Sequence, residues 1–267
     1  MRVAAVQMRS GTERNANLDA AETLIRAAAE AGARLVATPE MTPFLVRGRE
    51  ALEARLCDEA DEPSLARMGA LAAELGIYLL LGSVAVRIKG RAHNRSYLFG
   101  RDGQVLARYS KMHMFDADVT ERDRWRESST YAAGTASVVG RTGAWRVGLS
   151  VCYDLRFAEL YRTYARAGCG LICVPAAFTV PTGQAHWETL LRARAIETGA
   201  YILAPAQGGA HADGRATWGR SRIIGPWGEV VAKIDDDAPS WTLAEIDRGE
   251  VELARERITA WRQEPRL

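Results

Sequence analysis

Apolar and polar residues alternate along the first third of the chain in patterns that predict strands and helices in turn. Period-two or continuous apolar runs indicate strands, and apolar residues at three- and four-residue steps indicate the buried face of a helix. The elements predicted in this third are strand 2–8, helix 16–32, strand 34–40, helix 63–76 and strand 77–86. This order predicts consecutive strand–helix–strand units.

The rest of the chain continues this alternation after one hairpin and one irregular stretch. Asp102-Gly103 is a strong turn signal and predicts a hairpin over 95–110. Residues 112–134 have little periodicity and many charges, which is typical of a functional loop. The elements predicted beyond it are strand 144–154, helix 156–168, strand 170–177, helix 185–199, strand 200–206, hairpin 221–234, strand 241–246 and a helix near 249–258.

The strands at 171–177 (LICVPAA) and 201–206 (YILAPA) are apolar on both faces, so both faces must be covered. An α/β fold of two packed sheets with helices outside satisfies this requirement, and an open doubly wound sheet is the alternative. Because no linker or repeat interrupts the chain, we expect one domain over 1–267, with its core at about 3–246 and a tail after about 258.

Composition narrows the class of protein. Apolar residues make up 48% of the chain and charged residues 25%, which is ordinary for a globular protein and excludes disorder and collagen-like repetition. The 35 basic and 33 acidic residues are interleaved and leave a net charge of +2, so no nucleic-acid partner is expected.

The location of the protein is predicted from its apolar runs and its cysteines. Gln7 and Arg9 interrupt the N-terminal apolar stretch, so it does not read as a secretion signal. No apolar run approaches the roughly 20 residues that span a bilayer, so no membrane association is expected. Four cysteines in an unexported chain of this length indicate free thiols in a reducing compartment, which predicts a cytoplasmic protein.

Cys152 is the sharpest chemical feature, because it ends an apolar strand just before a predicted helix near Arg156. A strand-to-helix turn is where a nucleophile is presented. We expect the helix N-terminus to lower the pKa of the thiol, free backbone N–H groups to stabilise an oxyanion, and Asp154 to cap the helix. The alternative is a small buried residue that merely ends a core strand.

Two further reactive side chains end strands. Glu40 closes strand 34–40, with the apolar residues 41–45 behind it, and Lys111 ends the strand that leads into the irregular loop. Active sites of layered α/β folds assemble where strands end, so Glu40, Lys111 and Cys152 are candidates for one site. Taken singly, Glu40 and Lys111 could equally be solvated surface charges. None of the four histidines stands at a convincing strand end to serve as the base.

The remaining cysteines do not form a metal site. Cys169 and Cys173 lack a second pair of ligands at suitable spacing, so no zinc site is expected. We expect Cys57, Cys169 and Cys173 to be structural residues.

Three segments together resemble the catalytic motifs of the nitrilase superfamily, the carbon–nitrogen hydrolases with a Glu-Lys-Cys triad. They are RLVATPE at 34–40, YSKMHMFD at 109–116 and LSVCYDLRFAEL at 149–160, and the likeness runs from about Val3 to about Ile246. The resemblance implies a four-layer α-β-β-α sandwich that needs no metal or organic cofactor. It also implies a homodimer or higher homo-oligomer joined through the helices beside the nucleophile. The aromatic residues of helix 157–168 favour such a contact.

The same resemblance implies a role for each matched residue. Cys152 would be the nucleophile and Glu40 the general base. Lys111 and the backbone N–H of Tyr153 would stabilise the oxyanion, and Glu127 would orient Lys111 and the substrate. The product would be released through hydrolysis of a thioester.

Residues 175–209 are most similar to the amidases that act on deaminated glutathione, and less closely to omega-amidases. Two features differ from those amidases: Arg220 stands where they usually carry histidine, and their basic tail is replaced by residues 261–267. The resemblance implies a small carboxylate-bearing amide as substrate, releasing ammonia, with deaminated glutathione as the leading candidate. Omega-amidase, nitrilase and N-carbamoyl amino-acid hydrolase activities remain alternatives, as does a catalytically silent binding protein.

Six residues at the presumed cleft are candidates for binding this substrate. Arg156 or Arg220 could hold its carboxylate, although Arg156 could equally pair with a carboxylate inside the fold. The other candidates, which would shape the cleft, are Tyr153, Ala176, Phe178 and Thr179.

Overall fold

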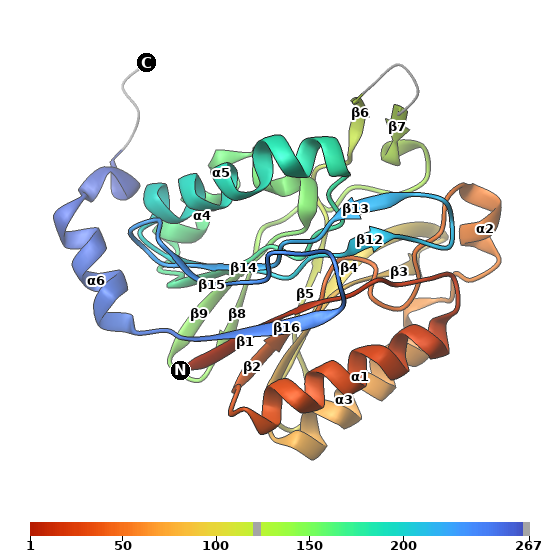
Figure 1. The fold of residues 1–267 in the computed structure, drawn as a ribbon, viewed down its shortest axis with the longest axis horizontal. Coiled ribbons are helices and arrows are strands. Elements are labelled where there is room, and N and C mark those ends of the chain that lie inside the picture. The colour runs from red at the N-terminus through yellow and green to blue at the C-terminus, as the bar shows by residue number, and fades with distance from the viewer. Residues whose placement is uncertain (120–123, 264–267) are drawn as a thin grey trace.

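Two six-stranded sheets lie face to face in the computed structural model, which describes residues 1–119 and 124–263 (Figure 1). The first sheet has the order β16-β1-β2-β3-β4-β5 and the second β15-β14-β11-β10-β9-β8. The first sheet consists of β1 (Arg2–Gln7), β2 (Leu35–Ala37), β3 (Tyr78–Ile88), β4 (Arg91–Phe99), β5 (Val105–Ser110) and β16 (Ser240–Glu245). The second consists of β8 (Val138–Thr142), β9 (Trp145–Leu149), β10 (Leu171–Cys173), β11 (Tyr201–Ala204), β14 (Arg222–Ile224) and β15 (Val230–Lys233).

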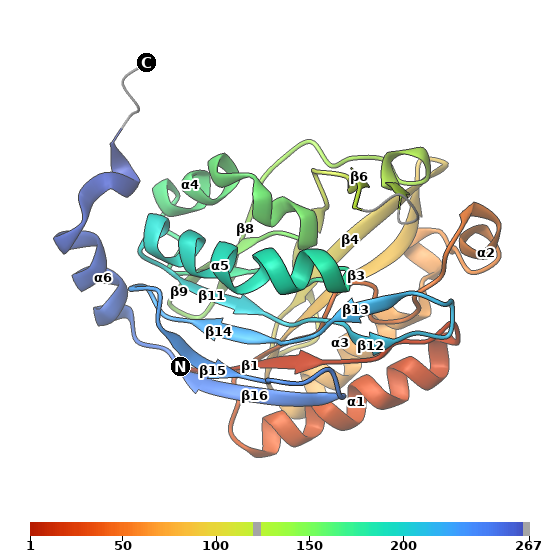
Figure 2. The ribbon, with the colours of Figure 1, turned by 45° about the horizontal axis from the view of Figure 1, so that its top comes forward.

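Helices cover the outer face of each sheet. In Figures 1 and 2, α1 and α3 lie against the first sheet, and α4 and α5 lie on the opposite side against the second. The described helices are α1 (Arg14–Glu30), α2 (Arg49–Glu53), α3 (Pro63–Leu75), α4 (Ala158–Arg166), α5 (Val180–Thr198) and α6 (Arg248–Arg257). The expected four-layer α-β-β-α sandwich is therefore confirmed, and the open doubly wound sheet was wrong.

The double covering explains why the central strands are apolar throughout. Along β1, Val3 and Ala5 belong to the core between the sheets, whereas Ala4 and Val6 pack toward the helices. Successive side chains of a strand point to opposite faces, so a strand covered on both sides has no position for a solvated residue. Within the described residues, no helix is both long and apolar enough to cross a membrane.

Several boundaries and small elements differ from those predicted. The helix predicted at 156–168 begins later, because α4 starts at Ala158, after the 3-10 turn η3 (Cys152–Arg156). The helix predicted at 185–199 begins earlier, because α5 starts at Val180, with Pro181 in its first turn. The strand predicted at 144–154 is shorter in the structure: β9 ends at Leu149, and η3 begins at Cys152. Elements that the pattern missed are α2, β8, the hairpin β6 (Asp116–Asp118) and β7 (Arg124–Arg126), and the hairpin β12 (Gly208–Ala210) and β13 (Ala216–Trp218). Residues 120–123 of the predicted loop and 264–267 of the predicted tail lie outside the described residues.

Gly82 on β3 lies in close contact with both the end of β2 and the second sheet. A Cβ atom there would lie 1.8 Å from the carbonyl oxygen of Thr38, and 2.7 Å from both the Pro39 carbonyl oxygen and Cβ of Pro175. Pro175 follows β10 in the second sheet, so glycine allows β3, the end of β2 and the Pro175 side chain to meet. Since Glu40 follows Pro39 directly, this contact also fixes where Glu40 leaves the sheet.

Gly82→Ala is expected to destabilise the protein by about 3 kcal/mol or more, because the added methyl group meets backbone atoms that cannot move aside. Gly140→Ala is the matched control: its Cβ would meet the end of the flexible Leu98 side chain, at 2.5 Å from Cδ2. Urea unfolding of both variants measures the difference. Equal or greater destabilisation by Gly140→Ala would contradict this account of the sheet contact.

Candidate active site

Four chain segments bring the predicted reactive side chains to one cavity at the end of the sandwich. Glu40 follows β2, Lys111 follows β5, Glu127 begins the 3-10 turn η2 (Glu127–Ser129) after β7, and Cys152 begins η3 after β9. All four line a cavity of about 410 Å³. A cavity of this size suits a small ligand. The structure thus places together residues that are up to 112 positions apart in the sequence.

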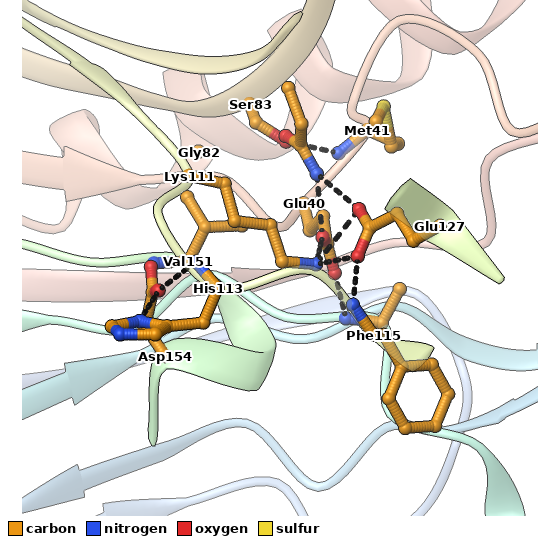
Figure 3. A network of polar contacts seen from close by, with 12 residues as sticks. Glu40, Met41, Gly82, Ser83, Lys111, His113, Phe115, Glu127, Val151 and Asp154 are labelled. Atoms are coloured by element: carbon orange, nitrogen blue, oxygen red, sulfur yellow. Dashed lines mark hydrogen bonds and ion pairs between the residues drawn. The ribbon is translucent and has the colours of Figure 1, made fainter. Parts of the chain in front are cut away.

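The Lys111 ammonium group lies between two carboxylates, as Figure 3 shows. Its Nζ is 3.0 Å from Oε1 of Glu40 and 2.8 Å from Oε2 of Glu127, and the lysine side chain is only 2% exposed. Burial disfavours the charge, but Glu127 and Glu40 outweigh it and raise the pKa of Lys111 well above its ordinary value. Lys111 is therefore a permanently charged hydrogen-bond donor on the cavity floor.

Backbone and amide donors hold the two carboxylates in place. The N–H of Ala177 donates to the second oxygen of Glu40 over 2.9 Å, and the N–H of Phe115 donates to Glu127 over 2.7 Å. Asn94 on β4 donates to Glu40 over 2.8 Å and also lies 3.4 Å from Glu127. Asn94 was not among the predicted site residues. The feature that marks Asn94 as a site residue is a polar side chain at a buried, inward-facing position of a strand.

Cys152 adopts a backbone conformation that side chains rarely occupy, with φ of +50°. Its N–H donates to the carbonyl oxygen of Pro175 over 2.8 Å, which anchors the strained residue to the end of the neighbouring strand. Strain of this kind is typical of functional sites. The structure therefore presents Cys152 on a sharp turn, as the pattern predicted.

The prediction of a lowered thiol pKa was wrong. Burial and the charge of Glu40 raise the pKa of Cys152 well above its ordinary value, although Lys111 and the Ala177 backbone act in the opposite direction. No long helix begins at the thiol, because η3 is a single short turn and α4 starts six residues later. In the free protein the thiol is thus kept neutral, with a carboxylate nearby to receive its proton.

The prediction that Asp154 caps the helix was wrong, because Phe157 occupies the N-cap position of α4. Asp154 is instead fully buried and accepts hydrogen bonds from the N–H of Val151 at 2.8 Å and the hydroxyl of Tyr109 at 2.7 Å. It also binds the backbone N–H and ring Nδ1 of His113 at 3.1 and 2.7 Å (Figure 3). Asp154 therefore fastens the Cys152 turn to the segment that carries Lys111.

The predicted substrate arginines do not line the cavity. The guanidinium carbon of Arg156 lies 5.6 Å from the Tyr153 ring centre and 5.4 Å from that of Phe178. Arg220 lies 4.4 Å from the Trp218 ring centre and donates to the carbonyl oxygen of Trp218 over 3.0 Å. Both arginines are thus held on aromatic rings outside the cavity.

Of the other predicted cleft residues, Thr179 lines the cavity and three do not. Ala176 is fully buried and pairs with Ala206 in a short parallel bridge. Phe178 packs its ring 4.9 Å from that of Trp187. Tyr153 lies beside the cavity, against the ring of Phe115 at 5.1 Å. Ala177, between Ala176 and Phe178, is the residue of this segment that reaches the cavity.

Most residues of the outer cavity wall were not among the predicted site residues. The lining residues of this wall include Trp125 on β7 and three residues outside the named helices and strands, Arg47, Tyr131 and Arg215. Trp125 lies in the irregular stretch 112–134, whose charge density was the available signal. Within residues 1–119 and 124–263, no three His, Cys, Asp or Glu side chains gather as metal ligands.

Comparison with known proteins identifies relatives along the whole chain. The sequence model of the carbon-nitrogen hydrolase family matches residues 2–256. A deaminated glutathione amidase of Synechocystis is 40% identical over 261 residues, covering 96% of this chain and 94% of its own. An omega-amidase of Xenopus tropicalis is 36% identical over 264 residues, covering 98% and 94%.

Solved structures of related proteins share the fold of this chain. The NitFhit protein of C. elegans superposes with a TM-score of 0.89 at 34% identity over 98% of this chain, which spans 64% of that longer protein. The yeast Nit3 protein, a member of the nitrilase superfamily, has a TM-score of 0.87 at 26% identity, covering 97% and 94%. A mutant amidase from Nesterenkonia, with a TM-score of 0.81 at 25% identity over 97% of this chain and 100% of its own, carries acrylamide added to its active-site cysteine.

Alkylation of Cys152 tests the electrostatics of the site, because only the thiolate reacts. Glu40 raises the pKa of Cys152, so Glu40→Gln should lower that pKa and speed alkylation by iodoacetamide at pH 7. Lys111 lowers it, so Lys111→Met should slow the reaction. Both are measured by mass spectrometry on a Cys57→Ser background, since Cys57 is only half-buried. Slower alkylation in Glu40→Gln than in its parent would contradict the conclusion that Glu40 raises the pKa of Cys152.

Proposed function

Because the chain belongs to the carbon–nitrogen hydrolase family, we propose that it is an amidase that hydrolyses a small carboxylate-bearing amide through a thioester on Cys152. The observation that carries this proposal is the cavity floor, where Cys152 and a buried Lys111 clamped by Glu40 and Glu127 line the same space. These residue types supply a nucleophile, a base and a fixed positive charge.

In the first half of the reaction, Glu40 removes the proton of Cys152 as the sulfur attacks the amide carbon. The carbonyl oxygen becomes an oxyanion, which Lys111 and the backbone N–H of Tyr153 stabilise. Glu40 then returns the proton to the amide nitrogen, the carbon–nitrogen bond breaks, and ammonia or an amine leaves. A neutral resting thiol suits this sequence, because the proton is needed by the leaving group.

In the second half, a water molecule replaces the departed amine. Glu40 takes a proton from this water, the hydroxyl oxygen attacks the thioester carbon, and the sulfur leaves as a thiol on receiving that proton. The carboxylic acid is released and the site returns to its starting state. Glu127 takes no proton in this scheme: it positions Lys111, which explains why it binds the ammonium with both oxygens, at 3.0 and 2.8 Å.

Deaminated glutathione is the leading substrate, supported by the 40% identity to a deaminated glutathione amidase. The amide bonds of a glutathione skeleton are secondary, so this reaction would release an amine rather than the ammonia that a primary amide releases. The 36% identity to an omega-amidase supports a primary ω-amide as the second candidate. A panel of deaminated glutathione, ω-amides, nitriles and carbamoyl compounds, assayed for both ammonia and amine, separates these activities.

Assembly into a homodimer or higher homo-oligomer is also part of the proposal, on the ground of the family resemblance. The aromatic residues of helix 157–168 do not support it, because Tyr161 and Tyr164 are fully buried within the chain. Their hydroxyl groups bind Ser150 and the carbonyl oxygen of Leu149. A cytoplasmic location is proposed from the four free cysteines.

Cys152→Ala should reduce amide hydrolysis by more than about 10³-fold while leaving the fold intact, because the variant removes the nucleophile and little volume. The rate of product release and the thermal unfolding midpoint are measured together. Cys169→Ala and Cys173→Ala are the controls, since both thiols are buried in the core and outside the cavity. A soluble Cys152→Ala protein with more than about a thousandth of the parental rate would exclude the thioester route.

The proposed assembly predicts a species of at least twice the 29.2 kDa chain mass at micromolar concentration. Sedimentation equilibrium measures this mass directly. A single species near the chain mass over the whole concentration range would refute the proposed oligomer and leave the catalytic proposal untouched.

A further inference from the structure

Acidic and basic side chains line different parts of the cavity. The cavity floor is the part formed by Glu40, Lys111, Glu127 and Cys152, and the cavity wall is formed by the other lining residues. On the floor, two carboxylates share the single ammonium group of Lys111. The wall contains no further carboxylate among the described residues. It does contain five arginines, which are Arg47, Arg49, Arg124, Arg126 and Arg215.

Most of this positive charge is not neutralised inside the fold. Arg126 pairs with Asp118 at 2.8 Å, and Nε of Arg215 lies 2.7 Å from Asp213. Across residues 1–119 and 124–263, no carboxylate lies within ion-pair distance of the other three cavity arginines, Arg47, Arg49 and Arg124. The wall is therefore a region of positive potential, which focuses anionic ligands into the cavity.

Two of the arginines are held on one aromatic ring. The guanidinium carbon of Arg47 lies 5.4 Å from the centre of the Trp125 ring, and that of Arg215 lies 5.3 Å from it. Arg215 also donates to the carbonyl oxygen of Val46 over 2.6 Å, which ties it to the segment of Arg47. A guanidinium group held against a ring keeps N–H groups on its edge available for a carboxylate.

Trp125 itself adds an unused donor. Its indole N–H is buried and has no hydrogen-bond acceptor among the described residues. Buried donors without a partner are uncommon, and one that lines a ligand cavity is satisfied when a ligand atom accepts from it. Two residues further along the chain, Glu127 holds Lys111, so the same short segment forms part of both the floor and the wall.

We propose that Arg47, Arg215 and Trp125 form an anion subsite that binds a substrate carboxylate at the end remote from the reacting amide. This inference rests on the proposed amidase function. The floor cluster carries one negative charge when both glutamates are ionised, so it repels a carboxylate, while the wall attracts one. The cavity therefore orients the substrate, with its neutral amide toward Cys152 and its carboxylate toward the arginines.

A matched pair of substrates tests the subsite. Glutaramate carries a carboxylate four bonds from its amide carbon, and pentanamide has a methyl group in its place. Arg47→Gln should raise KM for glutaramate about tenfold or more, as expected for losing a charge-assisted hydrogen bond, with little change in kcat. The KM for pentanamide should not change. Arg47 is the cleaner target because its side chain is exposed and makes no internal ion pair.

Two further variants separate binding from folding. Arg215→Lys keeps the charge but loses the forked donors, so it should raise KM for glutaramate less than Arg215→Gln does. Arg141→Gln, on β8 and outside the cavity, is the control for removing a surface arginine and should leave both KM values unchanged. Thermal unfolding midpoints identify any variant that is damaged generally.

Binding without turnover distinguishes this inference from the function on which it rests. On a Cys152→Ala background, calorimetry of glutaramate should show a Kd about tenfold weaker with Arg47→Gln. If the wild-type protein hydrolyses glutaramate but Arg47→Gln and Arg215→Gln leave KM and Kd unchanged, the subsite is wrong and the amidase proposal stands. If the wild-type protein hydrolyses no amide yet glutaramate binding still depends on Arg47, the function is wrong and the subsite stands.

Discussion

The buried ammonium group of Lys111 is the constraint on which the rest of the site depends. A charge that is 2% exposed persists in the fold only with compensating partners, and Lys111 has two carboxylates. Removing one partner of such a buried pair typically costs about 3–5 kcal/mol, because the remaining charge is left without compensation. The carboxylates in turn need the donors of Asn94, Ala177 and Phe115. The charge of Lys111 therefore connects β4 of the first sheet, the segment after β10 of the second sheet and the hairpin of β6 and β7.

A second buried group couples the nucleophile to this charge. Asp154 binds the N–H of Val151, next to Cys152, and both the backbone and the ring of His113, two residues beyond Lys111. Catalysis by a thiol and an ammonium group requires both to reach one carbonyl group within a fraction of an ångström. Asp154 supplies that alignment across the space between the sheets, which explains why a carboxylate is fully buried beside the active turn.

The raised pKa of Cys152 changes how the family's chemistry is understood in this chain. A thiolate that had lost its proton to solvent would leave no proton for the departing nitrogen, whereas a neutral thiol beside Glu40 keeps that proton within the site. The cavity then divides its tasks by charge. In the proposed reaction, its floor performs proton transfer and oxyanion stabilisation, and its arginine-lined wall orients the anionic end of the substrate.

The sequence by itself determined the alternation of strands and helices, the double covering of the apolar strands, and the positions of Glu40, Lys111 and Cys152 at strand ends. These features are local, because periodicity and strand termination depend on neighbouring residues. The tertiary structure alone decided the thiol pKa, the roles of Asn94 and Asp154, and which arginines reach the cavity. Arg156 is only four residues from Cys152 in sequence but lies on aromatic rings outside the cavity, whereas Arg215 reaches the cavity from the turn between β12 and β13. Burial, long-range charge and loop convergence depend on packing between the sheets, which no local pattern encodes.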